Sequence, residues 1–231
     1  MTYTKQVGVK FDEKGNPLKI PGNTVICFIN TENNSILFEE LIWAQAELKK
    51  LSFSHKYAVL PPSSFHMTVI ELLMDRYRDA PFWPSMLKRD KELSEIDTLY
   101  QSIIDSIEKN KFTMKIDRAD DTKFILSPYN EENRKLLKKY RDLVAEKTGL
   151  RFDNHDQYRF HISLFYQLQT LIPEEEKELA SVLEKINQRV LNRIKYFNTD
   201  EPKFTIFNDI YMFSEDLSAR RVEDISKRFS S

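Results

Sequence analysis

The chain has 231 residues, of which 41% are hydrophobic and 31% are charged, a composition typical of an ordinary soluble globular protein. Its 35 basic and 36 acidic residues give a formal net charge of −1, which argues against a protein that binds long duplex nucleic acid. It contains four glycines and no glycine-rich phosphate loop, which excludes the dinucleotide-binding and P-loop classes.

Short apolar runs bounded by turn residues predict strands, and apolar residues spaced by three and four predict helices. In chain order, the sequence predicts strands at 7–11 and 24–30, a helix at 35–51, strands at 57–60 and 65–73, a helix at 92–109, strands at 112–116 and 123–126, a helix at 131–147, a strand at 158–168, a helix at 173–196 and a strand region at 204–213. The third helix ends at Gly149 and the fourth begins with Pro173.

These elements lack a regular strand–helix–strand rhythm, so the sequence predicts an α+β fold with antiparallel sheets. No linker rich in proline, serine or glycine divides the chain. Residues 1–231 are therefore expected to form one compact unit of one or two lobes, with a polar, frayed tail from about residue 214. The charged and aromatic stretch 75–91 is expected to be a loop, either a lid or a connection.

Two further features bear on location and redox chemistry. No apolar stretch approaches 18 residues, and the N-terminus lacks the pattern of a secretory signal, so we expect a cytoplasmic protein without a membrane partner. The single cysteine, Cys27, lies in an apolar run and is expected to be a buried hydrophobic side chain. The oligomeric state is left open.

The most informative feature is a short internal repeat. Phe65-His66-Met67-Thr68-Val69 recurs 95 residues later as Phe160-His161-Ile162-Ser163-Leu164, and both copies read Phe-His-apolar-hydroxyl-apolar. Because side chains alternate between the two faces of a strand, each copy presents an imidazole and a hydroxyl on one face and three apolar side chains on the other.

If the two strands are neighbours, two imidazoles and two hydroxyls converge on one cleft that suits a phosphodiester. One of His66 and His161 accepts a proton from the attacking oxygen while the other donates a proton to the leaving oxygen. The hydroxyls of Thr68 and Ser163 donate to the non-bridging oxygens. This scheme needs neither a metal nor a cofactor.

Other interpretations of the histidines stay open. His66 and His161 are alternatively buried strand histidines whose ring nitrogens bond to neighbouring groups. His55 is expected to be a solvated loop or helix-capping residue. The dipeptide His155-Asp156, with Asp153 nearby, suggests a metal-dependent phosphohydrolase as an alternative function.

The two His-x-Thr/Ser motifs resemble those of the two-histidine (2H) phosphoesterases, which include 2',5'-RNA-ligase-like enzymes and cyclic nucleotide phosphodiesterases. The likeness is to an uncharacterised branch of that superfamily and extends from about Gly8 to Phe213. It is carried by three longer segments: Pro21-Gly22-Asn23-Thr24-Val25, Ser64-Phe65-His66-Met67-Thr68-Val69 and Tyr158-Arg159-Phe160-His161-Ile162-Ser163-Leu164.

This resemblance implies a bilobal, pseudo-symmetric α+β fold, with two mainly antiparallel sheets flanked by helices around a central cleft. It implies metal-independent hydrolysis or transesterification of 2',3'-cyclic or 2',5'-linked phosphoesters, with His66, Thr68, His161 and Ser163 as catalytic residues. It also permits a nucleotide-binding module of the same fold that does not turn its ligand over.

The substrate is expected to be a nucleotide or an RNA end, because the near-neutral chain offers few phosphate contacts. Arg159 shares the strand face of His161 and is a candidate phosphate ligand. Tyr158, Tyr166 and the loop that carries Tyr77 and Trp83 are candidates for stacking on a base.

Overall fold

The computed structural model describes residues 2–221. Its strands are β1 (Gly22–Phe28), β2 (Tyr57–Val59), β3 (His66–Met74), β4 (Thr113–Asp120), β5 (Lys123–Pro128), β6 (His161–Ser163), β7 (Phe165–Gln167), β8 (Phe197–Asn198), β9 (Lys203–Phe207) and β10 (Phe213–Ser214). Its α-helices are α1 (Thr31–Leu48), α2 (Leu93–Asp105), α3 (Glu131–Thr148) and α4 (Pro173–Arg193). Short 3-10 helices lie at Ser54–Lys56, Pro62–Ser64, His155–Gln157 and Leu217–Ala219.

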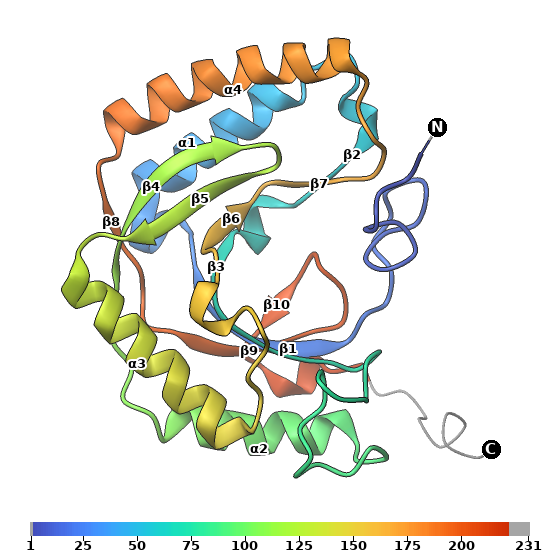
Figure 1. Cartoon of the computed structure of the whole chain (residues 1–231), viewed down its shortest axis with the longest axis vertical. Helices are drawn as coiled ribbons and strands as arrows, with labels where there is room; N and C mark the ends of the chain where they lie inside the picture. Colours follow the sequence, from blue (N-terminus) through green and yellow to red (C-terminus); the bar gives the residue numbers. More distant parts are fainter. Residues whose placement is uncertain (1, 222–231) are drawn as a thin grey trace.

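Eight strands form one curled antiparallel sheet in the order β10-β9-β1-β3-β6-β5-β4-β8, and β2 pairs with β7 in a small second sheet (Figure 1). The order strand, helix, motif strand occurs twice, as β1-α1-β3 and as β5-α3-β6, and each motif strand pairs with the strand that precedes its helix. The two motif strands, β3 and β6, meet at the centre of the sheet. The α+β class and the pseudo-symmetric plan are confirmed, and the two halves share one continuous sheet.

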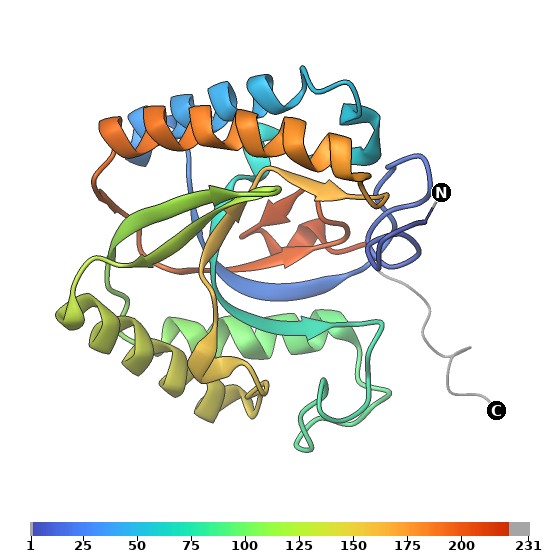
Figure 2. The ribbon, with the colours of Figure 1, turned by 45° about the horizontal axis from the view of Figure 1, so that its top comes forward.

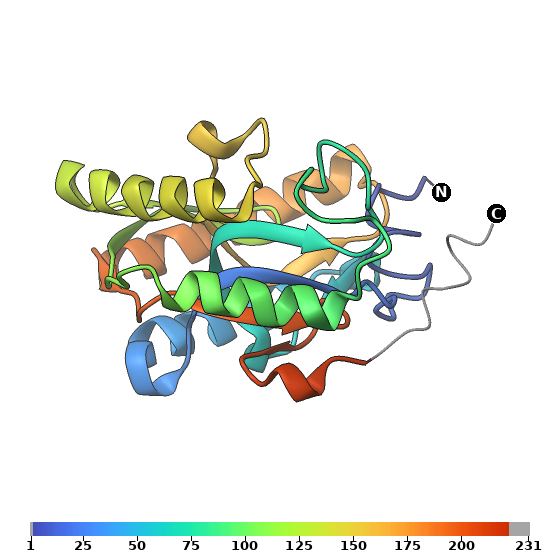
Figure 3. The same cartoon turned by 90° about the horizontal axis from the view of Figure 1, so that it is seen from below.

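The helices lie in two pairs on opposite sides of the curled sheet, α1 with α4 and α2 with α3 (Figure 2). Arg189 of α4 forms an ion pair with the buried Glu40 of α1, and the Tyr100 hydroxyl of α2 donates to the Thr148 carbonyl of α3. Seen from below, α2 and α3 both lie on the side nearest the viewer (Figure 3). In the described part of the chain, no helix combines the length and apolar character needed to cross a membrane.

The core is continuous across both halves. Apolar residues of the two motif strands, Met67 and Ile162, are fully buried in the same cluster as residues of all four helices. Cys27 is also buried, as expected, and burial raises the pKa of its thiol to about 12. The packed core on one face of the sheet therefore gives β3 and β6 a rigid support.

Three expectations about individual segments are wrong. Residues 7–11 form turns and isolated bridges, because Gly8 adopts a left-handed conformation (φ 78°) and its amide bonds back to the Phe11 carbonyl. The expected strand 158–168 breaks at Leu164, whose amide bonds to Thr122 instead of continuing the sheet, so that β7 pairs with β2. Residues 214–221 are ordered: Arg220 is buried and paired with Asp97. The rest of the expected tail lies outside the described residues.

Candidate active site

The two histidine motifs lie side by side. Met67 of β3 pairs with Ile162 of β6 in antiparallel register, which places His66 opposite Ser163 and Thr68 opposite His161. The apolar residues of both motifs are buried beneath the sheet, whereas the two imidazoles and two hydroxyls are half-buried on the opposite face. All four polar side chains line one pocket of about 460 Å³. The predicted catalytic residues are therefore brought together in one place.

Backbone carbonyls fix the orientation of both imidazole rings. Nδ1 of His66 donates to the Ser64 carbonyl (2.6 Å), and Nδ1 of His161 donates to the Arg159 carbonyl (2.8 Å). A carbonyl only accepts, so each Nδ1 carries the hydrogen, and in the neutral ring the lone pair is on Nε2. Among residues 2–221, neither Nε2 has a hydrogen-bond partner. Each ring therefore offers Nε2 as a base when neutral and as an acid when protonated.

The pocket disfavours the charged form of both rings. Burial is the main reason that the pKa of His66 is lowered to about 4; the Ser64 carbonyl opposes this shift, and the nearby charges of His161 and Lys10 add to it. Burial also lowers the pKa of His161, with smaller contributions from Lys123 and Lys10. Both rings are therefore neutral near pH 7, and a bound anion would raise both pKa values.

Lys10 is a pocket residue that the sequence pattern does not reveal. The turn-rich segment before β1 carries it into the lining, where its Nζ lies 3.0 Å from the Tyr166 hydroxyl and 4.4 Å from the centre of that ring. Its charge acts on both histidines and on Glu71. Lys10 is far from both motifs in sequence, so no local spacing could have identified it.

Glu71 is a second residue that sequence reasoning missed. Thr68 pairs with Ile26 and Ile70 with Val25, so Val69 is an extra residue on β3 and forms a β-bulge. The bulge reverses the alternation of faces, so that Glu71 rather than Ile70 lines the pocket. Desolvation by the pocket walls raises the pKa of the Glu71 carboxyl against the opposing charges of Lys10 and Arg141. The only sequence signal was an acid inside an apolar run.

Aromatic side chains form much of the remaining wall. Tyr158 stacks on His161 (ring centroids 6.4 Å apart) and interacts with the Thr68 hydroxyl, and Phe213 lies 4.3 Å from the His66 ring. Further rings in the lining belong to Tyr77, Phe82, Phe152, Tyr166 and Phe207. Both tyrosines predicted near the motif, Tyr158 and Tyr166, thus lie in the pocket.

Two of the other candidates lie away from the pocket lining. The Arg159 side chain is exposed and not part of the lining, and its contribution to the site is the carbonyl that holds His161. From the 75–91 loop, Tyr77 lines the pocket, but Trp83 is buried against the Arg78 guanidinium instead. His55 is exposed in a 3-10 helix, as expected.

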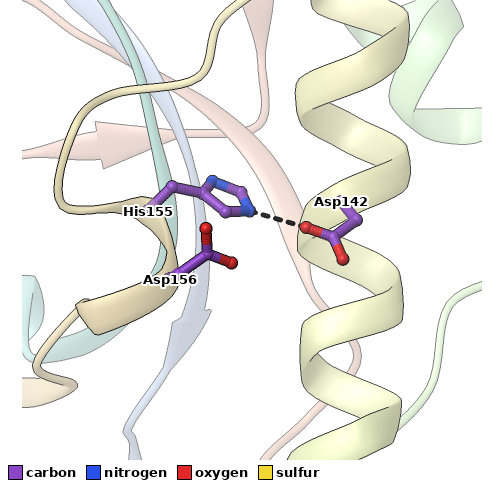
Figure 4. Close-up of side chains that lie close together, drawn as sticks. All are labelled: Asp142, His155 and Asp156. Carbon is purple, nitrogen blue, oxygen red and sulfur yellow. Dashed lines mark hydrogen bonds and ion pairs between the residues drawn. The ribbon is translucent and has the colours of Figure 1, made fainter.

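His155 and Asp156 belong to a separate cluster with Asp142 of α3 (Figure 4). His155 is buried and its Nε2 lies 3.0 Å from Asp142, while Arg151 and Lys138 pair with both aspartates. These cations hold the pKa of both carboxyls below the usual value. The ligand atoms lie within 4.8 Å of one another, which suits a metal in spacing, but every group already has a partner. Asp153 lines the pocket and is not in this cluster.

Comparison with known proteins places this geometry in a family. No curated protein matches the chain. A conserved protein of unknown function from Agrobacterium tumefaciens strain C58 has a similar structure, with a TM-score of 0.87 and 24% identity over 94% of this chain and 93% of that one, which shows the shared fold. A protein from Thermus thermophilus is a looser match, with a TM-score of 0.40 and 15% identity over 80% and 86% of the two chains, and supports no conclusion.

A family model described as "2H-phosphodiest: Domain of unknown function (DUF1868)" matches residues 10–125, half of the chain. The matched segment includes the first histidine motif on β3, and the second lies beyond it on the adjacent β6. The chain therefore belongs to the two-histidine phosphodiesterase family that this model describes.

Proposed function

We propose that this protein is a metal-independent phosphodiesterase that hydrolyses a 2',3'-cyclic or 2',5'-linked phosphoester of a nucleotide or an RNA end. The observation that carries the proposal is the pairing of two imidazoles, each anchored through Nδ1 and each with a free Nε2, in one pocket beside two hydroxyls. That arrangement supplies a base and an acid for the same substrate without any further group.

The two histidines act on opposite ends of the phosphoryl transfer. The neutral ring takes a proton from the attacking water as its oxygen bonds to phosphorus, and the protonated ring gives a proton to the sugar oxygen as the P–O bond breaks. After one turnover the two rings have exchanged protonation states. The near symmetry of His66 and His161 suits this exchange, and the direction of the cleaved bond decides which ring starts as the base.

The remaining polar groups stabilise the charge on the phosphoryl oxygens. The hydroxyls of Thr68 and Ser163 face the same pocket and donate hydrogen bonds to the non-bridging oxygens in the transition state. Lys10 supplies a positive charge near both rings. Binding of the phosphate anion raises the pKa of the acid histidine, so the substrate itself helps to protonate the ring that must act as an acid.

The rest of the pocket suits a nucleoside. Its volume of about 460 Å³ falls within the range of roughly 300–1,000 Å³ for small-molecule sites. Aromatic rings line it beyond the histidines, and such rings bind bases by stacking. A single nucleotide or the terminal nucleotide of an RNA matches these features better than a long strand does.

The test is hydrolysis of 2',3'-cyclic mononucleotides, 2',5'-linked dinucleotides and 3',5'-cyclic nucleotides in the presence of EDTA. We expect turnover of at least one of the first two classes by the wild type, and a loss of about 10²–10⁴ in rate for His66→Ala and for His161→Ala. His55→Ala is the matched control, since His55 is exposed and outside the pocket lining, and should keep the wild-type rate.

Three outcomes contradict the proposal. Full activity in either folded histidine variant removes the two-histidine mechanism. Tight nucleotide binding without product over hours indicates a binding module. Activity that disappears with EDTA and returns with a divalent cation supports a metal-dependent phosphohydrolase instead.

A further inference from the structure

The mechanism leaves the two acidic side chains of the pocket lining, Glu71 and Asp153, unused; Glu71 lies on the motif strand β3 itself, and Asp153 lies in the loop before β6. Glu71 faces the pocket because of the bulge at Val69, and within residues 2–221 no donor lies within hydrogen-bond distance of its carboxylate. The nearest cations, Lys10 and Arg141, act on it only through their charges; Lys10 bonds to Tyr166 and Arg141 to the His155 carbonyl. The Glu71 side chain is exposed to the pocket, so its carboxylate oxygens are open to hydrogen-bond donors of a bound substrate.

The position of Glu71 along β3 indicates which part of the substrate it meets. The strand begins at the phosphoryl end of the pocket with His66 and Thr68, and Glu71 lies three residues further along, at most roughly 10 Å from Thr68 at the rise of an extended strand. This separation is comparable with the distance from the phosphorus of a nucleotide to the far edge of its base.

Aromatic rings from the loop after β3 and from the segment before β6 also line this pocket. β3 runs on from Glu71 to Met74, and the loop after it supplies Tyr77 and Phe82, whose rings lie 5.5 Å apart. Phe82 in turn lies 6.0 Å from Phe152, and all three rings line the pocket. The pocket therefore combines aromatic walls suited to a base with the Glu71 carboxylate in the same lining.

We propose that Glu71 is a specificity-determining residue that selects guanine, by accepting hydrogen bonds from the N1–H and the exocyclic amine of the base. This inference rests on the proposed function and names the substrate class for the same site. A carboxylate has two acceptor oxygens and no donor, and guanine is the common base that presents two adjacent N–H donors on one edge. Hypoxanthine keeps only the ring N–H, while adenine offers an acceptor at N1.

The substrate itself provides the matched comparison. We would measure kcat/KM for the 2',3'-cyclic phosphates of guanosine, inosine, adenosine and uridine with the wild type and with Glu71→Gln. The wild type should prefer guanosine to inosine by roughly ten- to a hundredfold, the discrimination typical of a bidentate contact. In Glu71→Gln this ratio should fall to near one, while the inosine substrate loses much less.

Two further variants separate recognition from folding and from net charge. Glu71→Asp keeps the charge but shortens the side chain, and should retain part of the guanosine preference. Glu39→Gln removes the same charge from an exposed position on α1, and should leave the ratio unchanged. Thermal unfolding of each variant shows whether the comparison is between folded proteins.

The outcomes distinguish this inference from the proposed function. A wild type that hydrolyses the cyclic phosphates with equal kcat/KM for guanosine and inosine, or a preference that survives Glu71→Gln, overturns the role of Glu71 and leaves the phosphodiesterase intact. If no substrate is hydrolysed, the proposed function fails, and calorimetric binding of guanosine and inosine 3'-monophosphates to the same proteins decides the question for Glu71. Equal affinities would then contradict the inference.

Discussion

Within residues 2–221, histidines and other polar side chains come together both in the pocket and in the cluster at α3, and the two places differ in which groups are left without a partner. In the pocket, His66 and His161 each use one nitrogen for the backbone and leave the other without a partner among the described residues. In the cluster at α3, His155 binds Asp142, and both aspartates of that cluster are neutralised by cations. The first arrangement leaves acid–base groups available to a ligand, whereas the second holds residues 151–158 against α3.

This difference shows that a group of chemically suitable residues is a poor guide to function until their partners are known. His155-Asp156 looks like a fragment of a metal site in sequence, but Arg151 and Lys138 already pair with the Asp156 carboxylate. The pocket histidines, by contrast, face a space lined by aromatic rings.

The largest effect should come from the pair in the pocket acting as a unit. A His66→Ala/His161→Ala double variant should be slower than the wild type by little more than the worse of the two single variants, because losing either ring already disables the joint proton transfer. Steady-state kcat values for the four proteins on one cyclic nucleotide check this. Losses that multiply would show that the rings act independently.

The sequence could predict the site residues that belong to a short repeated motif on one strand. Alternation along a strand placed His66 with Thr68, and His161 with Ser163, on one face, and the structure has them there. The antiparallel α+β fold followed from the order of the elements. These predictions depend only on the period of the backbone, which is a local property.

What the sequence could not show depends on contacts between distant segments. The β-bulge depends on how β3 pairs with β1. A pattern that assumes a regular strand therefore places Glu71 on the wrong face. Lys10 reaches the pocket through a folded N-terminal segment, and the break at Leu164 reflects a bond to Thr122 across the sheet. Such features require the tertiary structure.

The hydroxyls of the pocket should matter next. Thr68→Val preserves shape and removes the donor, and Ser163→Ala does the same at the other motif. We expect kcat to fall by about 10²–10³ for each, as for the loss of a donor to a developing oxyanion, with a smaller change in KM. Pre-steady-state and steady-state kinetics measure the split. A change confined to KM would mean that the hydroxyls hold the substrate and not the transition state.

The cluster at α3 should respond in stability and not in rate. Asp142→Ala leaves the buried Nε2 of His155 without its partner, which should lower the free energy of unfolding by about 1–3 kcal/mol. Chemical denaturation measures this loss, and kcat well below the melting temperature should stay near the wild-type value. If EDTA abolished the activity of the wild type and a divalent cation restored it, and if elemental analysis found bound metal, the cluster would instead be a metal centre.

The smallest effect concerns pH. Turnover requires one neutral and one protonated ring, and both pKa values in the free protein lie below the usual 6.5, that of His66 near 4. The profile of kcat/KM should therefore have its maximum below pH 6.5 and fall as the pH rises. The maximum of kcat should lie at higher pH, because the bound phosphate favours the imidazolium.

Lys10 disfavours the imidazolium form of both rings. Lys10→Met should accordingly move the alkaline limb of kcat/KM to higher pH by a fraction of a unit, even as it weakens substrate binding. A limb that stays in place or moves to lower pH would show that Lys10 does not set the electrostatics of the histidine pair.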